Sequence, residues 1–177
     1  DDGTPYNPTE THKKFIADTA RFCLLRGSRG SGKTAAGAEK SLGKVKQGKD
    51  GMVVNPDLEN FRLSTWPELR RWIPWDMVIP KQRYRKSDGW DVSRPFTMVF
   101  MNKRGGTTRV ICKGLRNPNS ARGPNNNWLW FDEARNDPDG MSWRNAIASV
   151  RIGKNPQAWA TTTTTGISHW LYEFFVE

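Results

Sequence analysis

Phosphate binding is the first chemistry that the sequence suggests, in the stretch RGSRGSGKT from Arg26 to Thr34. Gly27, Gly32, Lys33 and Thr34 fit the pattern GxxxxGK[ST]. Its glycines allow a tight loop in which backbone N–H groups and the N-terminus of the next helix face an anion. The lysine of such a loop reaches the β- and γ-phosphates of a nucleotide, and the threonine hydroxyl binds Mg²⁺. We therefore predict that nucleotide binds along Gly27, Ser28, Arg29, Gly30, Ser31, Gly32, Lys33 and Thr34.

Two adjacent acids, Asp132 and Glu133, form the second candidate site, directly after the apolar run WLWF. Ligands of open α/β sheets bind at the carboxyl edge of the strands, where these acids would lie beside the phosphate loop. Asp132 is suited to hold Mg²⁺, and Glu133 to orient and polarise an attacking water. A pair of surface acids at a strand end is the alternative. Together with the phosphate loop, the pair predicts nucleotide hydrolysis.

The acid at position 133 disfavours two other users of this loop. Small GTPases carry an [NT]KxD guanine signature, whereas NKRG has Gly105 in place of the aspartate. Nucleoside kinases transfer phosphate to a bound hydroxyl and need no glutamate to activate water. ATP hydrolysis coupled to movement is therefore the favoured class.

Positioning these residues requires an alternating α/β scaffold. Short apolar runs bounded by turn signals alternate with stretches of helical spacing, which is typical of a sheet flanked by helices. The predicted strands are Arg21–Leu25, Gly51–Asn55, Phe96–Asn102, Thr107–Leu115, Asn127–Ala134 and Gln157–Gly166. The predicted helices are Thr34–Val45, a segment from Thr65 to Pro74, a segment containing Trp143, Ile147 and Val150, and the C-terminal tail.

Two local signals refine this outline. Thr65 and Glu68 have capping-box spacing, which predicts that a helix begins at Thr65. The turn sequence KRGG between the third and fourth strands predicts an antiparallel hairpin. The expected fold class is therefore α/β, with a mainly parallel central sheet, flanking helices and an antiparallel hairpin addition.

Composition bounds the architecture and the partners. A chain of 177 residues is expected to form one compact domain. Its 28 Lys and Arg against 18 Asp and Glu give a net charge of +10, which attracts polyanions and makes nucleic acid the first partner to consider. A well-solvated basic surface is the alternative. The nine tryptophans are expected in the core.

Cysteine usage and hydropathy indicate the compartment. Cys23 and Cys112 lack the spacing of a zinc site or a disulfide framework, which fits a reducing, cytoplasmic setting. No apolar stretch approaches the ~20 residues needed to span a bilayer, and the first ten residues do not resemble a signal peptide. We expect a soluble intracellular protein.

These motifs together resemble the ATPase domain of large terminase subunits, the motors that package DNA into the heads of tailed phages. The resemblance runs over nearly the whole chain from Pro8. It rests on RGSRGSGKT, on SARGP at Ser120–Pro124 shortly before WLWFDEA, and on TTTTTG at Thr161–Gly166. It implies an ASCE-type P-loop ATPase fold that uses ATP and Mg²⁺, with Glu133 as the catalytic glutamate.

The resemblance also implies partners and a place of action. Such motors translocate double-stranded DNA, act with a small terminase subunit, and assemble as a ring, commonly of five subunits, on the portal of a procapsid in the host cell cytoplasm. Residues 1–177 would form the ATPase domain, with a lid or linker beginning at about residue 167. The nuclease domain of the complete subunit is absent from this chain, so no nuclease activity is expected of it.

Several positions receive roles only through this resemblance. Arg122 matches an arginine finger that reaches the γ-phosphate of a neighbouring subunit, a contact worth ~10³ or more in rate. Its alternative is a loop arginine that binds solvent or DNA phosphate. Arg29 matches an arginine found in many terminase phosphate loops, where it adds charge at the γ-phosphate or senses the loss of that phosphate.

The threonine run matches one further family motif, and a histidine lies nearest to the position of another. Thr161, Thr162 and Thr163 match a coupling motif that would exchange hydrogen bonds with Glu133 or the γ-phosphate. The alternative is simple β-propensity, and the family's frequent proline at the position of Thr164 leaves the register open by about one residue. The chain departs from the family where a glutamine before the first helix often recognises adenine: the nearest match is His12, which could still donate to a base edge, with a helix-surface histidine as the alternative.

Basic segments are the candidates for contact with DNA. KQRYRK places four cations around Tyr84, and two more lie at the tip of the predicted hairpin. Contacts to phosphate need only cations and carry little sequence preference, which suits a translocase. The candidate residues are Lys81, Arg83, Arg85, Lys86, Lys103 and Arg104. Ordinary solvated loops are the alternative.

Two rival functions stay open at this point. One is a helicase-like or other nucleic-acid-stimulated ATPase, although a helicase core ordinarily needs a second RecA-like domain. The other is a DNA-binding assembly module whose phosphate loop is only structural. The presence of Lys33, Thr34, Asp132 and Glu133 together disfavours that module.

Overall fold

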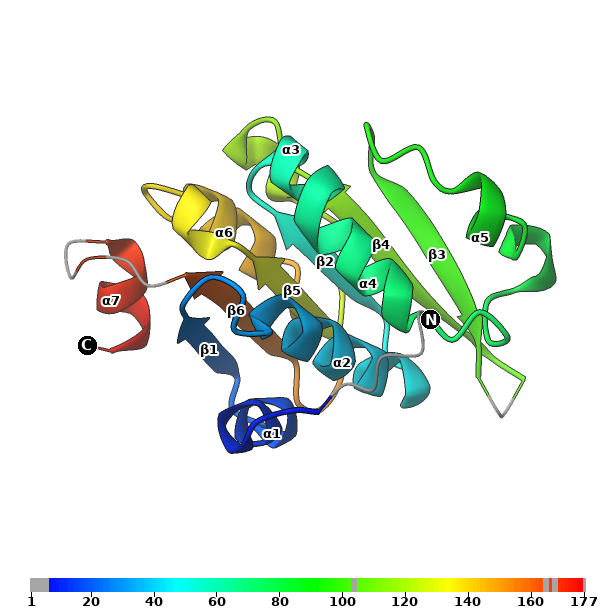
Figure 1. The fold of residues 1–177 in the computed structure, drawn as a ribbon, viewed down its shortest axis with the longest axis horizontal. Coiled ribbons are helices and arrows are strands. Elements are labelled where there is room, and N and C mark those ends of the chain that lie inside the picture. The colour runs from blue at the N-terminus through cyan, green and yellow to red at the C-terminus, as the bar shows by residue number, and fades with distance from the viewer. Residues whose placement is uncertain (1–6, 103–104, 164–165, 167–168, 177) are drawn as a thin grey trace.

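A six-stranded sheet forms the centre of the computed structural model, which describes residues 7–102, 105–163, 166 and 169–176. The strand order is β1-β6-β5-β2-β4-β3 (Figure 1). Adjacent strands run parallel except β3 and β4, which pair antiparallel. This confirms the predicted α/β class with its hairpin addition. The strands are β1 Phe22–Gly27, β2 Gly51–Asn55, β3 Phe96–Met101, β4 Thr107–Gly114, β5 Trp128–Asp132 and β6 Gln157–Thr163.

Helices cover both faces of the sheet. One hydrophobic cluster combines residues of α1, α2 and α4 with one set of strand side chains, and a second combines α6 and α7 with the opposite set. Val53 belongs to the first cluster, whereas Met52 and Val54 belong to the second, because successive side chains of a strand point to opposite faces. The helices are α1 Glu10–Ala17, α2 Lys33–Lys46, α3 Leu58–Asn60, α4 Trp66–Trp72, α5 Arg85–Asp88, α6 Met141–Ile147 and α7 Trp170–Phe175.

The central strand β5 is buried at every position, which explains its continuous apolar run. Two of its large side chains lie against glycines. A Cβ at Gly37 of α2 would lie 2.4 Å from the Trp130 ring, and one at Gly51 of β2 would lie 1.9 Å from Trp128. Trp143 and Trp159 are also fully buried. The expectation that tryptophans form the core is confirmed for these four.

The helical segment after β2 begins earlier than predicted. Asp57 caps it by accepting from the Asn60 N–H at 2.7 Å, and the chain passes through α3 and a π-helical turn, Phe61–Thr65, into α4. Thr65 has φ −62° and ψ −49° and makes no capping hydrogen bond. The predicted capping box at Thr65 is therefore wrong. The Thr65 hydroxyl is instead committed to the site below.

Other boundaries shift by a few residues. β1 continues to Gly27, the first residue of the phosphate-loop pattern, and β5 ends at Asp132. β6 is described to Thr163, and Thr164 lies outside the described ranges. Short 3₁₀ turns occur at Pro80–Gln82, Pro118–Ala121 and Ala134–Asn136. No helix in the described part of the chain is long and apolar enough to cross a bilayer.

Candidate functional site

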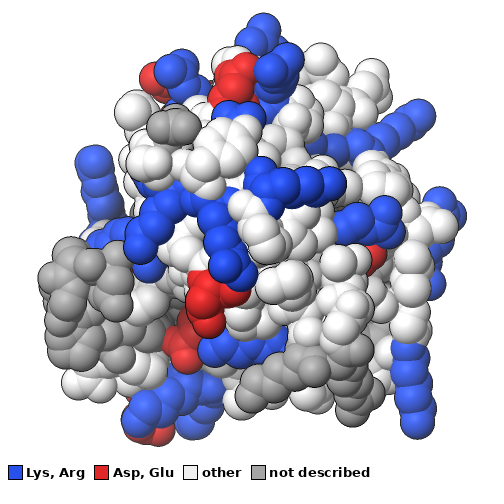
Figure 2. All heavy atoms as spheres, turned by 90° about the vertical axis from the view of Figure 1, so that its right-hand side faces the viewer, with Lys and Arg blue, Asp and Glu red and all other residues white. Residues whose placement is uncertain are grey.

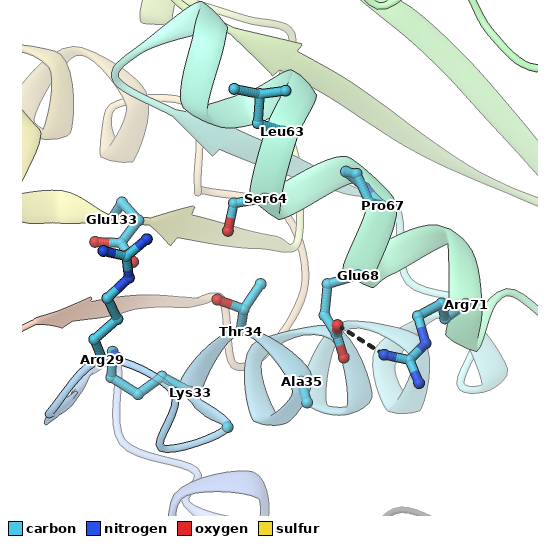
Figure 3. A pocket seen from close by; sticks show the side chains of 12 residues that line it. Arg29, Lys33, Thr34, Ala35, Leu63, Ser64, Pro67, Glu68, Arg71 and Glu133 are labelled. Atoms are coloured by element: carbon cyan, nitrogen blue, oxygen red, sulfur yellow. Dashed lines mark hydrogen bonds and ion pairs between the residues drawn. The ribbon is translucent and has the colours of Figure 1, made fainter. Parts of the chain in front are cut away.

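A cavity of about 510 Å³ lies where the phosphate loop, α4 and the end of β5 meet (Figure 3). The loop and the start of α2 form one wall, the segment from Leu63 to Arg71 forms another, and Glu133 lies at a third side. The Arg29 side chain extends in the direction of Glu133 in this view. The cavity is lined by Arg29, Gly30, Gly32, Lys33, Thr34, Ala35, Leu63, Ser64, Pro67, Glu68, Arg71 and Glu133.

The phosphate loop adopts a compact conformation that its glycines permit. Gly30 and Gly32 have φ of 76° and 80°, in the left-handed region that disfavours residues with a side chain. Lys33 is 6% exposed, and its Nζ donates to the Ser28 carbonyl at 2.8 Å. The Ser31 Oγ is buried and makes no hydrogen bond. The loop therefore holds its lysine at the base of the cavity and retains a hydroxyl that can still bond to a ligand.

Asp132 is fixed by hydroxyl groups from two distant segments. Its Oδ2 accepts from Thr65 Oγ1 at 2.6 Å, and its Oδ1 accepts from Thr161 Oγ1 at 2.6 Å. Asp132 is 1% exposed, and burial raises its pKa to about 6, against the effect of these two hydrogen bonds. A nearby cation would favour the charged form of such a carboxylate.

The donors around Asp132 suit a hard cation. Thr34 Oγ1 lies 3.5 Å from Asp132 Oδ1, so a hydroxyl and a carboxylate oxygen from two motifs adjoin. Mg²⁺ prefers such oxygen ligands and takes the rest from water and phosphates. No group of three or more His, Cys, Asp and Glu side chains that could hold a metal occurs among the residues described. The site therefore fits Mg²⁺ held jointly with a nucleotide.

Glu133 has an unusual backbone conformation. With φ 51° and ψ 48° it is the one non-glycine residue at positive φ in the described ranges. Its side chain lines the cavity, and its buried Oε2 makes no hydrogen bond, although Arg135 Nε lies 3.4 Å away. Such an outlier is typical of functional sites. Besides its ion pair with Arg135, this carboxylate oxygen is available to accept a hydrogen bond from a water molecule.

Two threonines of β6 form hydrogen bonds with Asp132 and with the segment that follows Glu133. Besides bonding Asp132, Thr161 Oγ1 accepts from Trp130 Nε1 at 2.8 Å. Thr162 Oγ1 accepts from the Arg135 N–H at 3.0 Å, two residues after Glu133. Thr163 lines a separate small cavity with Arg26. The structure thus brings Thr161 and Thr162 to the segment that carries the acids.

Sequence reasoning missed Thr65 and Asn55. The Asn55 Nδ2 donates to Thr65 Oγ1 at 3.0 Å, and both residues are fully buried. Asn55 is the last residue of β2 and lies at the same sheet edge as Asp132, so the predicted strand ends could have identified it as a candidate site residue. Thr65 gave no such signal, because it lies inside a helical segment and contacts an acid 67 residues away.

Of two further candidate residues, His12 is buried beside the phosphate loop and Arg122 is exposed. His12 is 7% exposed, and a Cβ at Gly32 would lie 3.2 Å from its Cε1, so its ring lies against the phosphate loop. The helix-surface alternative for His12 is therefore wrong. Arg122 is exposed and does not line the cavity described above.

The basic segment KQRYRK is partly structural. Arg83 donates to the carbonyls of Val78 and Asp76 at 2.8 and 2.7 Å, and the Arg85 guanidinium lies 4.7 Å from the centre of the Tyr84 ring. Lys81 and Lys86 are exposed. Lysines and arginines are spread over the face of the molecule beside β3 (Figure 2). Lys103 and Arg104 lie outside the described residues.

Comparisons with known proteins identify the family and the fold. The family profile described as terminase large subunit, T4likevirus-type, N-terminal, matches residues 24–177. The ATPase domain of the Thermus phage P74-26 large terminase superposes with a TM-score of 0.68 at 20% identity, over 96% of this chain and 70% of that one. No curated protein matches the chain by sequence.

Two longer terminase chains share the fold. The large terminase of a second thermophilic bacteriophage gives a TM-score of 0.69 at 16% identity, over 96% of this chain and 43% of its own. The large terminase of bacteriophage HK97 gives a TM-score of 0.69 at 12% identity, over 98% of this chain and 37% of its own. The former protein has also been solved with ADP and with ATP-γ-S. The chain spans about two fifths of these two proteins. It belongs to the family of T4-like large terminase subunits, in which it corresponds to the N-terminal part.

Proposed function

We propose that this chain is the ATPase motor domain of a DNA-packaging terminase, which hydrolyses ATP with Mg²⁺ to move double-stranded DNA into a procapsid. The observation that carries the proposal is the cavity lined by the phosphate loop, Thr34 and Glu133, with Asp132 Oδ1 lying 3.5 Å from Thr34 Oγ1. The complexes of the thermophilic phage terminase with ADP and ATP-γ-S support a nucleotide as the ligand.

Each residue then has a defined task. The loop N–H groups bind the phosphates, and Lys33 Nζ exchanges its bond to the Ser28 carbonyl for phosphate oxygens. Thr34 and Asp132 would hold Mg²⁺, which would supply positive charge to neutralise the phosphates. Glu133 orients the water that attacks the γ-phosphorus as the bond to the bridging oxygen breaks, giving ADP and phosphate. Arg29 adds positive charge at the γ-phosphate.

Hydrogen bonds after Glu133 offer a route from chemistry to movement. The Arg135 N–H donates to Thr162, and the Arg135 carbonyl lies 3.2 Å from His169 Nε2. Trp170 Nε1 donates to the Asp137 carbonyl. The segment after Glu133 is thus bonded to both the end of β6 and α7, so a change at the γ-phosphate would be transmitted to α7.

The remaining assignments complete the motor. Arg122, exposed and away from its own cavity, would serve as the finger of a neighbouring subunit in a ring, commonly of five, mounted on the portal in the host cytoplasm. His12 would contact the adenine from its place beside Gly32. Lys81 and Lys86 would contact DNA phosphate, and a small terminase subunit would deliver the DNA.

The test is ATP turnover by full-length subunits assembled on procapsids. Glu133→Gln should lower turnover at least ~100-fold, because it removes the base that orients water, while nucleotide affinity stays within about twofold. Glu39→Gln, at an exposed position of α2, is the matched control and should leave turnover unchanged. Native turnover by Glu133→Gln would overturn the assignment.

A further inference from the structure

A buried lysine lies beneath the loop that carries Arg122. Lys113 of β4 is 5% exposed, and its Nζ donates to the Ser120 carbonyl at 2.9 Å and to the Arg122 carbonyl at 2.6 Å. Both acceptors belong to the loop between β4 and β5. The Lys113 ammonium therefore bonds the backbone of Arg122 itself.

Burying this ammonium is costly for folding. Burial lowers the pKa of Lys113 to about 8, the effect expected when a cation leaves water. The same face of the sheet is otherwise filled by apolar side chains, including Met52, Leu115 and Ala121. An apolar residue would pack there without that cost. What the lysine adds is two hydrogen bonds that fix the loop.

Other contacts restrain the same loop on both sides of Arg122. Ala121 is fully buried, and Asn145 Nδ2 of α6 donates to the Pro118 carbonyl at 3.1 Å. A Cβ at Gly123 would lie 3.0 Å from Met52 Sδ, so the backbone after Arg122 lies directly on the core. The Arg122 side chain remains exposed. The backbone is held while the guanidinium faces outward.

We propose that Lys113 is a positioning residue that presents Arg122 to the nucleotide site of the neighbouring subunit. This proposal rests on the proposed role of Arg122 as a finger in trans. A finger stabilises a transition state only when its guanidinium is placed accurately, and a displacement of about 1 Å costs ~10²-fold in rate. The two hydrogen bonds from Lys113 of the sheet to carbonyls of the loop restrict that displacement.

The first test replaces Lys113 by methionine, which keeps length and removes the donors. Rings of full-length Lys113→Met subunits on procapsids should turn over ATP ~10- to 100-fold more slowly than native rings. Nucleotide affinity of the unassembled subunit should stay within about twofold, because Lys113 does not line the cavity. Lys46→Met, at an exposed position of α2, is the matched control and should leave both quantities unchanged.

A mixing experiment separates positioning from a general folding defect. A Lys113→Met subunit has an intact site and a misplaced finger, whereas a Glu133→Gln subunit has an inactive site and a correctly held finger. Mixed rings contain interfaces in which the second subunit completes the site of the first. Their turnover should therefore exceed the mean of the two pure rings several-fold. Absence of this rescue would overturn the proposal.

Two further variants keep the result decisive. If Lys113→Met does not fold, Gly123→Ala takes its place, because the added methyl would lie 3.0 Å from Met52 Sδ, so that the loop or Met52 must shift by a few tenths of an ångström while Lys113 is retained. Rings of Arg122→Ala identify which proposal fails. If Arg122→Ala rings turn over ATP slowly but Lys113→Met rings turn over ATP at the native rate, the positioning role alone is overturned. If Arg122→Ala rings turn over ATP at the native rate, both the finger in trans and the positioning role are overturned.

Discussion

Hydroxyl groups, not charged partners, hold the buried carboxylate of Asp132. Thr65 and Thr161 each donate at 2.6 Å, and Thr65 in turn accepts from Asn55. A carboxylate held by neutral donors keeps its negative charge available to a cation, whereas an ion pair would neutralise it. The arrangement supports the proposed role of Asp132 at a Mg²⁺ site.

Thr65→Val tests this arrangement. The change keeps the shape of the side chain but leaves the Asn55 amide and one Asp132 oxygen without their partner, which should lower the free energy of unfolding by ~1–3 kcal/mol. The Mg²⁺ concentration for half-maximal turnover should rise, since Asp132 is less well oriented. Denaturant unfolding and a Mg²⁺ titration measure the two effects. Thr65→Ser, which keeps the hydroxyl, is the control, and equal behaviour of the two variants would contradict the assignment.

Lys113 predicts a pH dependence of stability. Its pKa is about 8 in the folded chain and 10.5 when unfolded, so between these values the unfolded state binds more protons. The free energy of unfolding should therefore rise with pH over this window, by about 3 kcal/mol in total from this group. Lys113→Met should lack that rise. Unfolding of both proteins at pH 7.5 and 10 measures it, and parallel pH curves would contradict the prediction.

At the level of elements, the sequence predicts those features of the fold that depend on a local residue pattern. The phosphate loop, the buried β5 run and the hairpin follow from glycine spacing, continuous apolarity and turn residues. The start of the helix before α4 did not, because Asp57 offers a cap eight residues before Thr65 and the π-helical turn lets the helix continue. Which hydroxyls reach Asp132 depends on tertiary packing between segments far apart in sequence, and no local pattern encodes it.

Helix α1 depends on a buried lysine of α2. Lys40 Nζ donates to the carbonyls of Phe15 and Asp18 at 2.7 and 2.6 Å, at the C-terminal end of α1. Lys40→Met should lower the free energy of unfolding by ~1–3 kcal/mol, because the carbonyls lose a charged donor. Amide hydrogens of α1, which carries His12, should exchange faster. Lys14→Met, at an exposed position of α1, is the control, and unchanged exchange in Lys40→Met would contradict the prediction.

At the scale of the whole molecule, charge and assembly dominate. The net charge of +10 includes buried lysines such as Lys40 and Lys113, and several exposed or half-buried arginines bond nearby backbone carbonyls. Which cations contact DNA therefore could not follow from their number in the sequence. The structure leaves Lys81 and Lys86 exposed within the basic segment.

Lys81→Ala combined with Lys86→Ala tests contact with DNA. Loss of two phosphate contacts should reduce the slope of log affinity against log salt by about 1.8 for double-stranded DNA. Fluorescence anisotropy with duplexes of two unrelated sequences, at several salt concentrations, measures it with the full-length subunit. The double variant Lys14→Ala and Lys46→Ala removes the same charge elsewhere, and an equal loss of slope in both would mean that net charge alone is responsible.

The left-handed backbone of Glu133 has a consequence for how this protein responds to selection. A glycine at this position would relieve ~1–2 kcal/mol of backbone strain, and it would lose only the partly exposed ion pair with Arg135, a kind of contact worth ~0–1 kcal/mol. Glu133→Gly should therefore unfold at a higher temperature than the native chain and yet be inactive. A library screened for heat resistance alone would lose this glutamate early, whereas one screened for DNA packaging would keep it.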